Sequence, residues 1–80
     1  MSILNEIEVR YSNHLEIGQN AFEFVLVFGQ RYENQEGGLV HSKIVTTPFY
    51  AKRFAELLLE SVRRHERAVG PIPDREPETP

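Results

Sequence analysis

The chain lacks cysteine and tryptophan altogether, and its 80 residues include a single methionine and a single aspartate. Without cysteine, neither disulfides nor thiolate metal sites can stabilise a domain of this small size. The longest apolar run, residues 24–28, is far too short to span a membrane. The first residues also lack the basic and apolar regions of a secretory signal. We therefore expect a soluble cytoplasmic protein with no membrane segment.

Residues suited to catalysis are also sparse. Nucleophilic catalysis needs a nucleophile, a base and an orienting group, yet the only aspartate is Asp74 and no serine stands in a G-x-S-x-G motif. The three histidines lack the three- or four-residue spacing that places metal ligands on one helix face. We interpret His14 as facing water, His41 as lying on an exposed strand and His65 as lying near the end of a helix. We therefore expect no enzymatic activity, no metal and no cofactor.

The first half of the chain has the pattern of a β-meander. Residues 6–17 alternate between apolar and polar side chains, which is typical of a half-buried strand. Residues 18–20 favour a turn, and a second strand is predicted over about residues 21–32. A polar loop at residues 33–38 then leads to a third strand at residues 39–46, whose mixed pattern suits an edge or an interface. The sequence predicts three antiparallel strands.

In a strand, residues 22–28 place apolar side chains on both faces. A strand that is apolar on both faces must be covered on both faces, and one long helix can cover only one. We therefore expect the chain to form a homodimer or tetramer, or to hold an unfolded or partner protein. In the third strand, simple alternation places Leu39 and Val45 on the same face. The surface expected to form this oligomer or client interface comprises Val25, Val27, Leu39, Val45, Phe49, Ala55 and Leu59.

The second half of the chain predicts one long helix. Thr47 is a good N-cap and Pro48 suits the first helical position, while Gly70 and the proline after it end the helix. Leu59 widens the apolar stripe of this helix beyond what one sheet face needs. From residue 70 onward, four prolines and three acidic residues predict a disordered tail. The expected organisation is a single domain over residues 1–69 and a tail over residues 70–80.

Charge is unevenly distributed along the chain. The net charge of the whole chain is −3, but the predicted helix, residues 47–69, has five basic and three acidic side chains, which gives +2. An anion or a nucleic acid could bind this helix. Interleaved glutamates and the lack of exposed aromatic side chains that would stack on bases argue against nucleic acid. The possible contacts are Lys52, Arg53, Arg63, Arg64 and Arg67.

Two groups of residues carry resemblances to known families. The run over residues 40–54, together with Tyr11-Ser12-Asn13 in the first strand, resembles a family of small bacterial proteins of unknown function over about residues 7–69. That resemblance implies three antiparallel strands and then a helix, and implies no activity. Residues 10–21 also resemble the first strand and turn of SecB-type export chaperones, which hold unfolded polypeptide on apolar grooves.

Asn13 interrupts the apolar row of its strand and could mark a bulge or bend.

Together these patterns predict an α+β domain. It consists of a three-stranded antiparallel meander followed by one long C-terminal helix that packs on a single face of the sheet, and two or more copies associate. The function we expect is that of a non-enzymatic, homo-oligomeric protein-binding or adaptor module, with SecB-like polypeptide binding as one form of it. The alternative is nucleic-acid or anion binding through the basic helix.

Overall fold

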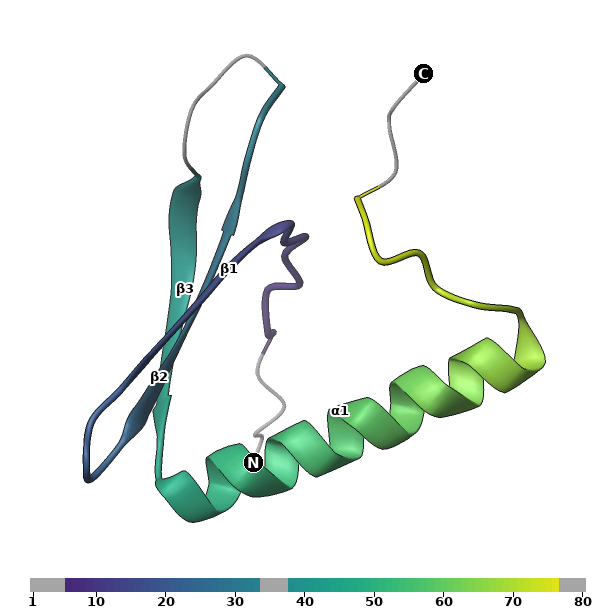
Figure 1. The fold of residues 1–80 in the computed structure, drawn as a ribbon. Coiled ribbons are helices and arrows are strands. Elements are labelled where there is room, and N and C mark those ends of the chain that lie inside the picture. Colours follow the sequence, from purple (N-terminus) through teal and green to yellow (C-terminus); the bar gives the residue numbers. More distant parts are fainter. Residues whose placement is uncertain (1–5, 34–37, 77–80) are drawn as a thin grey trace. The chain divides into compact units, whose positions relative to one another are not determined.

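The computed structural model describes residues 6–33 and 38–76 (Figure 1). Its elements are the strands β1 (His14–Gln19), β2 (Phe24–Gln30) and β3 (Leu39–Thr46), followed by the helix α1 (Pro48–Ala68). The order β-β-β-α confirms the predicted α+β fold. The chain divides into two compact units, residues 1–48 with the sheet and residues 49–80 with the helix. The packing of the helix on one face of the sheet stays a prediction.

The three strands form one antiparallel sheet in the order β1-β2-β3. The strand with apolar side chains on both faces, β2, is therefore the central one, and β3 is an edge strand as its mixed pattern predicted. The register sets Ile17 opposite Leu26 and Leu26 opposite Ile44, so apolar side chains lie side by side on one face across all three strands. The bounds predicted for β3 are confirmed.

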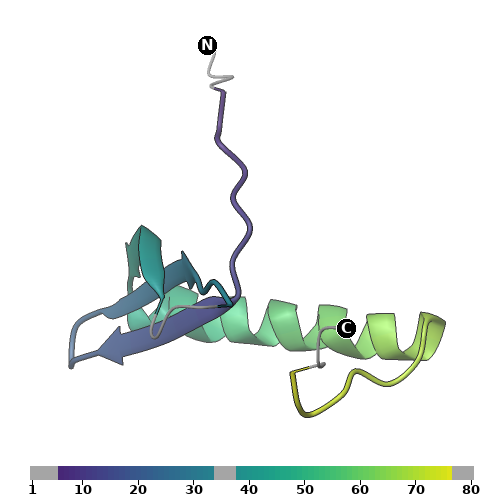
Figure 2. The ribbon, with the colours of Figure 1, turned by 90° about the horizontal axis from the view of Figure 1, so that it is seen from above.

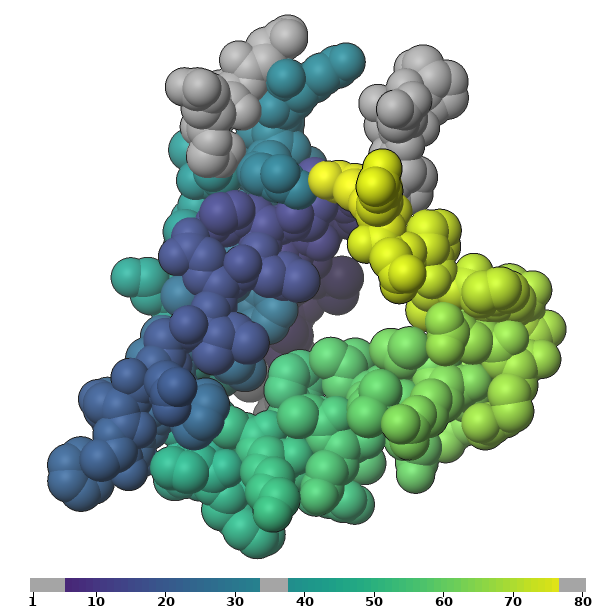
Figure 3. Space-filling model, in the orientation of Figure 1, coloured from purple at the N-terminus to yellow at the C-terminus, as the bar shows by residue number. Residues whose placement is uncertain are grey.

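The hairpin between β1 and β2 turns two residues later than predicted. Asn20 N donates to Glu23 O at 3.0 Å, and Asn20 Oδ1 accepts hydrogen bonds from Phe22 N and Glu23 N at 2.8 and 3.0 Å. This side-chain acceptor fixes the turn at Asn20 and leaves the preceding residues free to pair in β1. As a result Phe22, predicted to lie in the second strand, is in the turn and 83 % exposed. Figure 3 shows the hairpin turn (blue) projecting at the end of the sheet.

The first strand is shorter than the alternation over residues 6–17 predicted. Only His14–Gln19 pairs with β2, and Asn13 N donates to Gly29 O at 3.1 Å where the pairing ends. Residues 6–12 carry the pattern of a strand but lie outside the sheet, and Figure 2 shows this purple segment running away from it. Asn13 therefore marks the end of the strand rather than a bulge within it.

A bulge does occur, in β3. The register pairs Phe28 with Ser42 and Gly29 with Val40, so His41 is one extra residue on the β3 side. A Cβ atom on Gly29 would lie 2.5 Å from Leu39 O and 3.0 Å from Val40 Cα, so only glycine allows the two backbones to come this close. The extra residue also reverses the alternation of β3.

The two faces of the sheet follow from this register. One face, here called the leucine face, carries Leu15, Ile17, Phe24, Leu26, Phe28, Leu39 and Ile44. The other, here called the valine face, carries Val25, Val27, Val40 and Val45 together with His14, Glu16 and Lys43. The prediction that Leu39 and Val45 share a face is wrong, because simple alternation does not include the extra residue. In the edge strand β3, Ile44 of the leucine face is 52 % and Val45 of the valine face 59 % exposed.

The helix confirms the predicted start and end signals. It begins at Pro48, and Val69 N donates to His65 O at 2.8 Å in its last turn. Gly70 follows with a φ of 136°, a conformation that favours glycine. Residues 71–76 form neither helix nor strand, and the disorder predicted for the tail stays a prediction. Residues 77–80 of that tail, and residues 34–37 of the predicted loop, lie outside the described residues.

The close approach at Gly29 predicts a large difference between two glycine substitutions in the sheet. Gly29→Ala is expected to lower the free energy of unfolding by about 1–3 kcal/mol, because the new methyl group meets backbone atoms that cannot move aside. Gly18→Ala is the matched control, since nothing lies within 4 Å of its Cβ position, and its effect should stay within about 0.5 kcal/mol. Urea unfolding of the three proteins measures this, and equal stabilities would contradict the register at Gly29.

Candidate functional site

The valine face gathers three of the residues predicted to form an interface. Val25 and Val27 lie in the central strand, Val45 lies beside Val25 in β3, and the bulge adds Val40. Charged and polar side chains flank these valines. Lys43 lies opposite Val27 in β3, and His14 and Glu16 lie on the same face in β1. An apolar centre with a polar rim is the arrangement found in protein–protein interfaces. Leu39, predicted as part of the same surface, lies on the leucine face.

The β1 side of the valine face ends in a hydrogen-bonded pair of side chains. His14 Nε2 lies 2.6 Å from Glu16 Oε2, and the His14 side chain is only 19 % exposed. Its ring lies so close to Gly38 that a Cβ atom there would be 2.5 Å from His14 Cγ. The interpretation that His14 faces water is therefore wrong, because the ring is held between its acidic partner and the start of β3.

A cluster of hydrogen bonds, here called the polar junction, lies where β1 begins. It consists of Ser12, Asn13, Arg31 and His41. Asn13 Oδ1 accepts from Arg31 N at 2.6 Å, while Asn13 Nδ2 donates to Arg31 O at 3.2 Å. The Asn13 amide thus satisfies both backbone groups of Arg31, as a paired strand residue would. The Ser12 hydroxyl lies 2.9 Å from Gly29 O and 3.1 Å from His14 O, and donates between these carbonyl groups.

His41, the bulge residue, connects this junction to β3. Its Nε2 lies 2.9 Å from Tyr11 O and its Nδ1 lies 2.7 Å from Ser42 Oγ. A carbonyl oxygen can only accept, so Nε2 carries the proton and, in the neutral ring, Nδ1 accepts from the Ser42 hydroxyl. The half-buried ring therefore holds the chain at Tyr11 beside β3. Within residues 6–33 and 38–76, no three His, Cys, Asp or Glu side chains come close enough to hold a metal ion.

The polar junction is not predictable from the alternation of the sequence. The available signal was that Ser12 and Asn13, two residues whose side chains bond readily to backbone, interrupt the apolar–charged alternation of residues 6–17. Such an interruption marks the point at which side chains replace backbone partners. The partner, Arg31, lies 18 residues away and has no local signature.

The helix residues predicted for the interface do not form one surface. Ala55 and Leu59 lie one turn apart on the same side of α1, whereas Phe49 lies roughly 100° around the helix from them. Phe49 instead packs edge to face on Tyr50, with ring centroids 5.1 Å apart. Phe49, Tyr50 and Leu59 are all exposed. Only Leu59 also lines a hollow on the helix surface.

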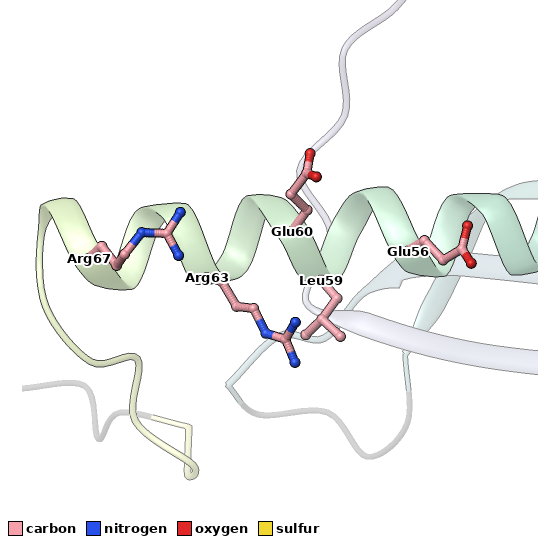
Figure 4. A pocket seen from close by; sticks show the side chains of 5 residues that line it. All are labelled: Glu56, Leu59, Glu60, Arg63 and Arg67. Atoms are coloured by element: carbon pink, nitrogen blue, oxygen red, sulfur yellow. The ribbon is translucent and has the colours of Figure 1, made fainter.

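The basic residues of α1 are divided by their acidic neighbours. Arg53 pairs with Glu56 at 3.5 Å, and Arg64 pairs with Glu60 at 3.3 Å. The hollow of Figure 4 is lined by two glutamates and two arginines in addition to the leucine, namely Glu56, Leu59, Glu60, Arg63 and Arg67. Figure 4 shows Leu59 and Arg63 extending to the same side of the helix. The predicted contacts therefore do not form a continuous positive patch, and Lys52 lies apart from this hollow.

Comparison with known proteins gives one match. A family model described as "Protein of unknown function (DUF3467)" matches residues 4–74. No curated protein and no solved structure matches the chain. The likeness to SecB-type chaperones gains no support from these comparisons. None of the helices in the described part of the chain has both the length and the apolar character needed to cross a membrane.

The Asn13 amide predicts a local change in hydrogen exchange. Asn13→Ala removes both bonds to the Arg31 backbone, so the Arg31 amide should exchange faster and the free energy of unfolding should fall by about 1–2 kcal/mol. Gln19→Ala is the control, because it truncates an exposed amide side chain at the opposite end of β1. Hydrogen exchange followed by NMR measures both effects. Unchanged protection of the Arg31 amide in Asn13→Ala would contradict this role.

Proposed function

The chain belongs to the protein family of unknown function DUF3467, and we propose that it is a non-enzymatic, homo-oligomeric protein-binding module of the cytoplasm. The observation that carries this proposal is the central position of β2, which has Phe24, Leu26 and Phe28 on one face and Val25 and Val27 on the other. The one helix that the described residues form can cover one of these faces at most. At least one apolar face is therefore left for another molecule.

A second copy of the chain is the occupant that fits this surface best. An exposed contiguous apolar surface favours aggregation. A second copy of the chain can cover this surface, because it is always present at the same concentration. Two-fold symmetry lets one self-complementary patch serve both copies. Among the two faces, the valine face has the polar rim of an interface, with Lys43 at β3 and the His14–Glu16 pair at β1. Binding of an unfolded client on the same face is the competing occupant.

One observation favours the alternative function, anion or nucleic-acid binding. Arg63 and Arg67 lie one turn apart around the hollow of Figure 4. Glu56 and Glu60 line the same hollow and reduce its positive potential, so this alternative is the weaker of the two. Affinity for labelled single-stranded nucleic acid that falls linearly with the logarithm of salt concentration would favour it. Binding that is absent at low salt would end it.

The proposed function is tested by mass in solution. Light scattering on the purified full chain should give at least a dimer, and Val45→Lys should lower that mass at least twofold because it places a charge in the centre of the valine face. Val69→Lys is the matched control, since the same substitution at another exposed valine, outside the sheet, should leave the mass unchanged. Circular dichroism checks that both variants fold.

Two results would count against the proposal. A wild-type chain that stays monomeric at micromolar concentration would overturn the homo-oligomer. A Val45→Lys variant that folds and keeps the wild-type mass would show that the copies do not meet at the valine face. If the wild-type chain is monomeric but binds unfolded polypeptide, the competing occupant holds that face.

A further inference from the structure

The segment before the sheet, residues 6–11 and here called the N-terminal arm, has the pattern of a strand without a partner strand. Its apolar side chains alternate with charged ones over the whole segment: Glu6, Ile7, Glu8, Val9, Arg10 and Tyr11. In this chain none of these residues pairs with the sheet. Ile7 is 81 % and Val9 94 % exposed, so its apolar side lies almost wholly in solvent. Such a segment is suited to pairing with the edge of a sheet.

The polar junction determines where the arm leaves the sheet. Asn13 is fixed to Arg31, and His41 donates to Tyr11 O at 2.9 Å. This bond joins the base of the arm to a side chain of β3, while Asn13 holds it beside the end of β2. From there the arm runs away from its own sheet (Figure 2). To pair with its own β3 the arm would have to turn back, whereas a neighbouring molecule can meet it directly.

The free edge of β3 fits the charge of the arm. Lys43 is its only lysine, arginine or carboxylate, and its eight residues contain neither proline nor glycine. Glu6 and Glu8 of the arm carry the opposite charge, and Glu8 exchanges its contact with Arg10 of the same arm, at 2.9 Å, for one with Lys43. The other edge strand, β1, carries Glu16, which would repel them. Opposite charges across neighbouring strands stabilise their pairing, and like charges destabilise it.

We propose that the N-terminal arm of one copy adds as a fourth strand to the β3 edge of a second copy, with Glu8 opposite Lys43 of that copy. The proposal rests on the proposed homo-oligomer to the extent that the partner is the same chain. Lys43 lies on the valine face, so this register places Glu8 there and turns Ile7 and Val9 toward the leucine face, beside Ile44. The apolar side of the arm then extends the more apolar face of the sheet.

The two copies exchange their arms reciprocally and form a closed dimer. Tyr11, at the base of the arm, is bonded to His41 of β3, so the arm leaves the sheet from a point tied to that strand. A two-fold axis can therefore bring each arm to the β3 edge of the other copy, which gives a closed pair rather than a filament. The backbone edge of β3 and the apolar centre of the valine face are different surfaces, and Lys43 belongs to both.

The absence of cysteine makes a disulfide test straightforward. In Glu8→Cys/Lys43→Cys, the two sulfur atoms should meet between copies, because opposed residues of neighbouring strands have Cα atoms about 4.5–5.5 Å apart, within disulfide range. We expect a covalent dimer on a non-reducing gel after mild oxidation. Glu8→Cys/Lys52→Cys is the matched control, since it uses the only other lysine, which lies on α1, and it should give little dimer.

The outcomes of the disulfide test separate a failure of the arm exchange from a failure of the proposed homo-oligomer. A disulfide formed only within the monomer would show that the arm folds onto its own β3, and the proposal would be wrong. A folded variant that stays reduced while the wild-type chain is oligomeric would also overturn it, and would leave the proposed function standing. A monomeric wild-type chain would instead remove both proposals. The two failures can thus be told apart.

A charge exchange tests the register without introducing cysteine. Lys43→Glu should raise the dissociation constant of the arm-joined pair about tenfold, because it sets two carboxylates against each other in each of two contacts. Glu8→Lys/Lys43→Glu should restore most of that affinity by reversing the pair. Sedimentation equilibrium measures all three proteins. A double variant as weak as Lys43→Glu would show that these two residues do not meet.

Discussion

The central strand is the constraint on which the rest of this structure depends. A strand with phenylalanine and leucine on one side and valine on the other cannot be satisfied by a three-stranded sheet, because its flanking strands cover its edges and leave its faces open. In the described residues the only buried apolar side chain is Ala51 of the helix. Stability therefore depends on burial of these faces, and a chain of 80 residues has little other material with which to bury them.

The polar junction shows how a few side chains decide where a strand stops. The alternation of residues 6–17 favours a strand throughout, yet pairing ends at Asn13 because its amide takes both backbone groups of Arg31. Local side-chain bonds compete with the sheet in this way whenever their geometry matches that of a backbone. The residues before Asn13 keep their strand pattern but lose their partner. The junction thereby converts part of a strand into an arm.

The parts of the fold that were predictable from sequence are those with strong local signals. Pro48 and Gly70 mark the ends of the helix, and a segment that is half β-branched, between the polar loop and Pro48, marks β3. The start of β1 and the bulge at His41 depend on contacts between distant residues, Asn13 with Arg31 and Gly29 with Leu39. Alternation alone cannot reveal such contacts. The candidate site shows the same division, since the valines were identifiable and the polar junction was not.

Faces and edges of a sheet impose different kinds of specificity, and the proposed assembly draws on both. Burial of a face is non-directional, so the valine face alone would accept any apolar surface of suitable shape. An edge is directional, because backbone groups and opposed side chains must be in register. Lys43 on the β3 edge discourages pairing with most strands, as charges on natural edges do. The N-terminal arm carries acidic residues at alternate positions. Lys43 therefore favours pairing with the arm over pairing with other strands.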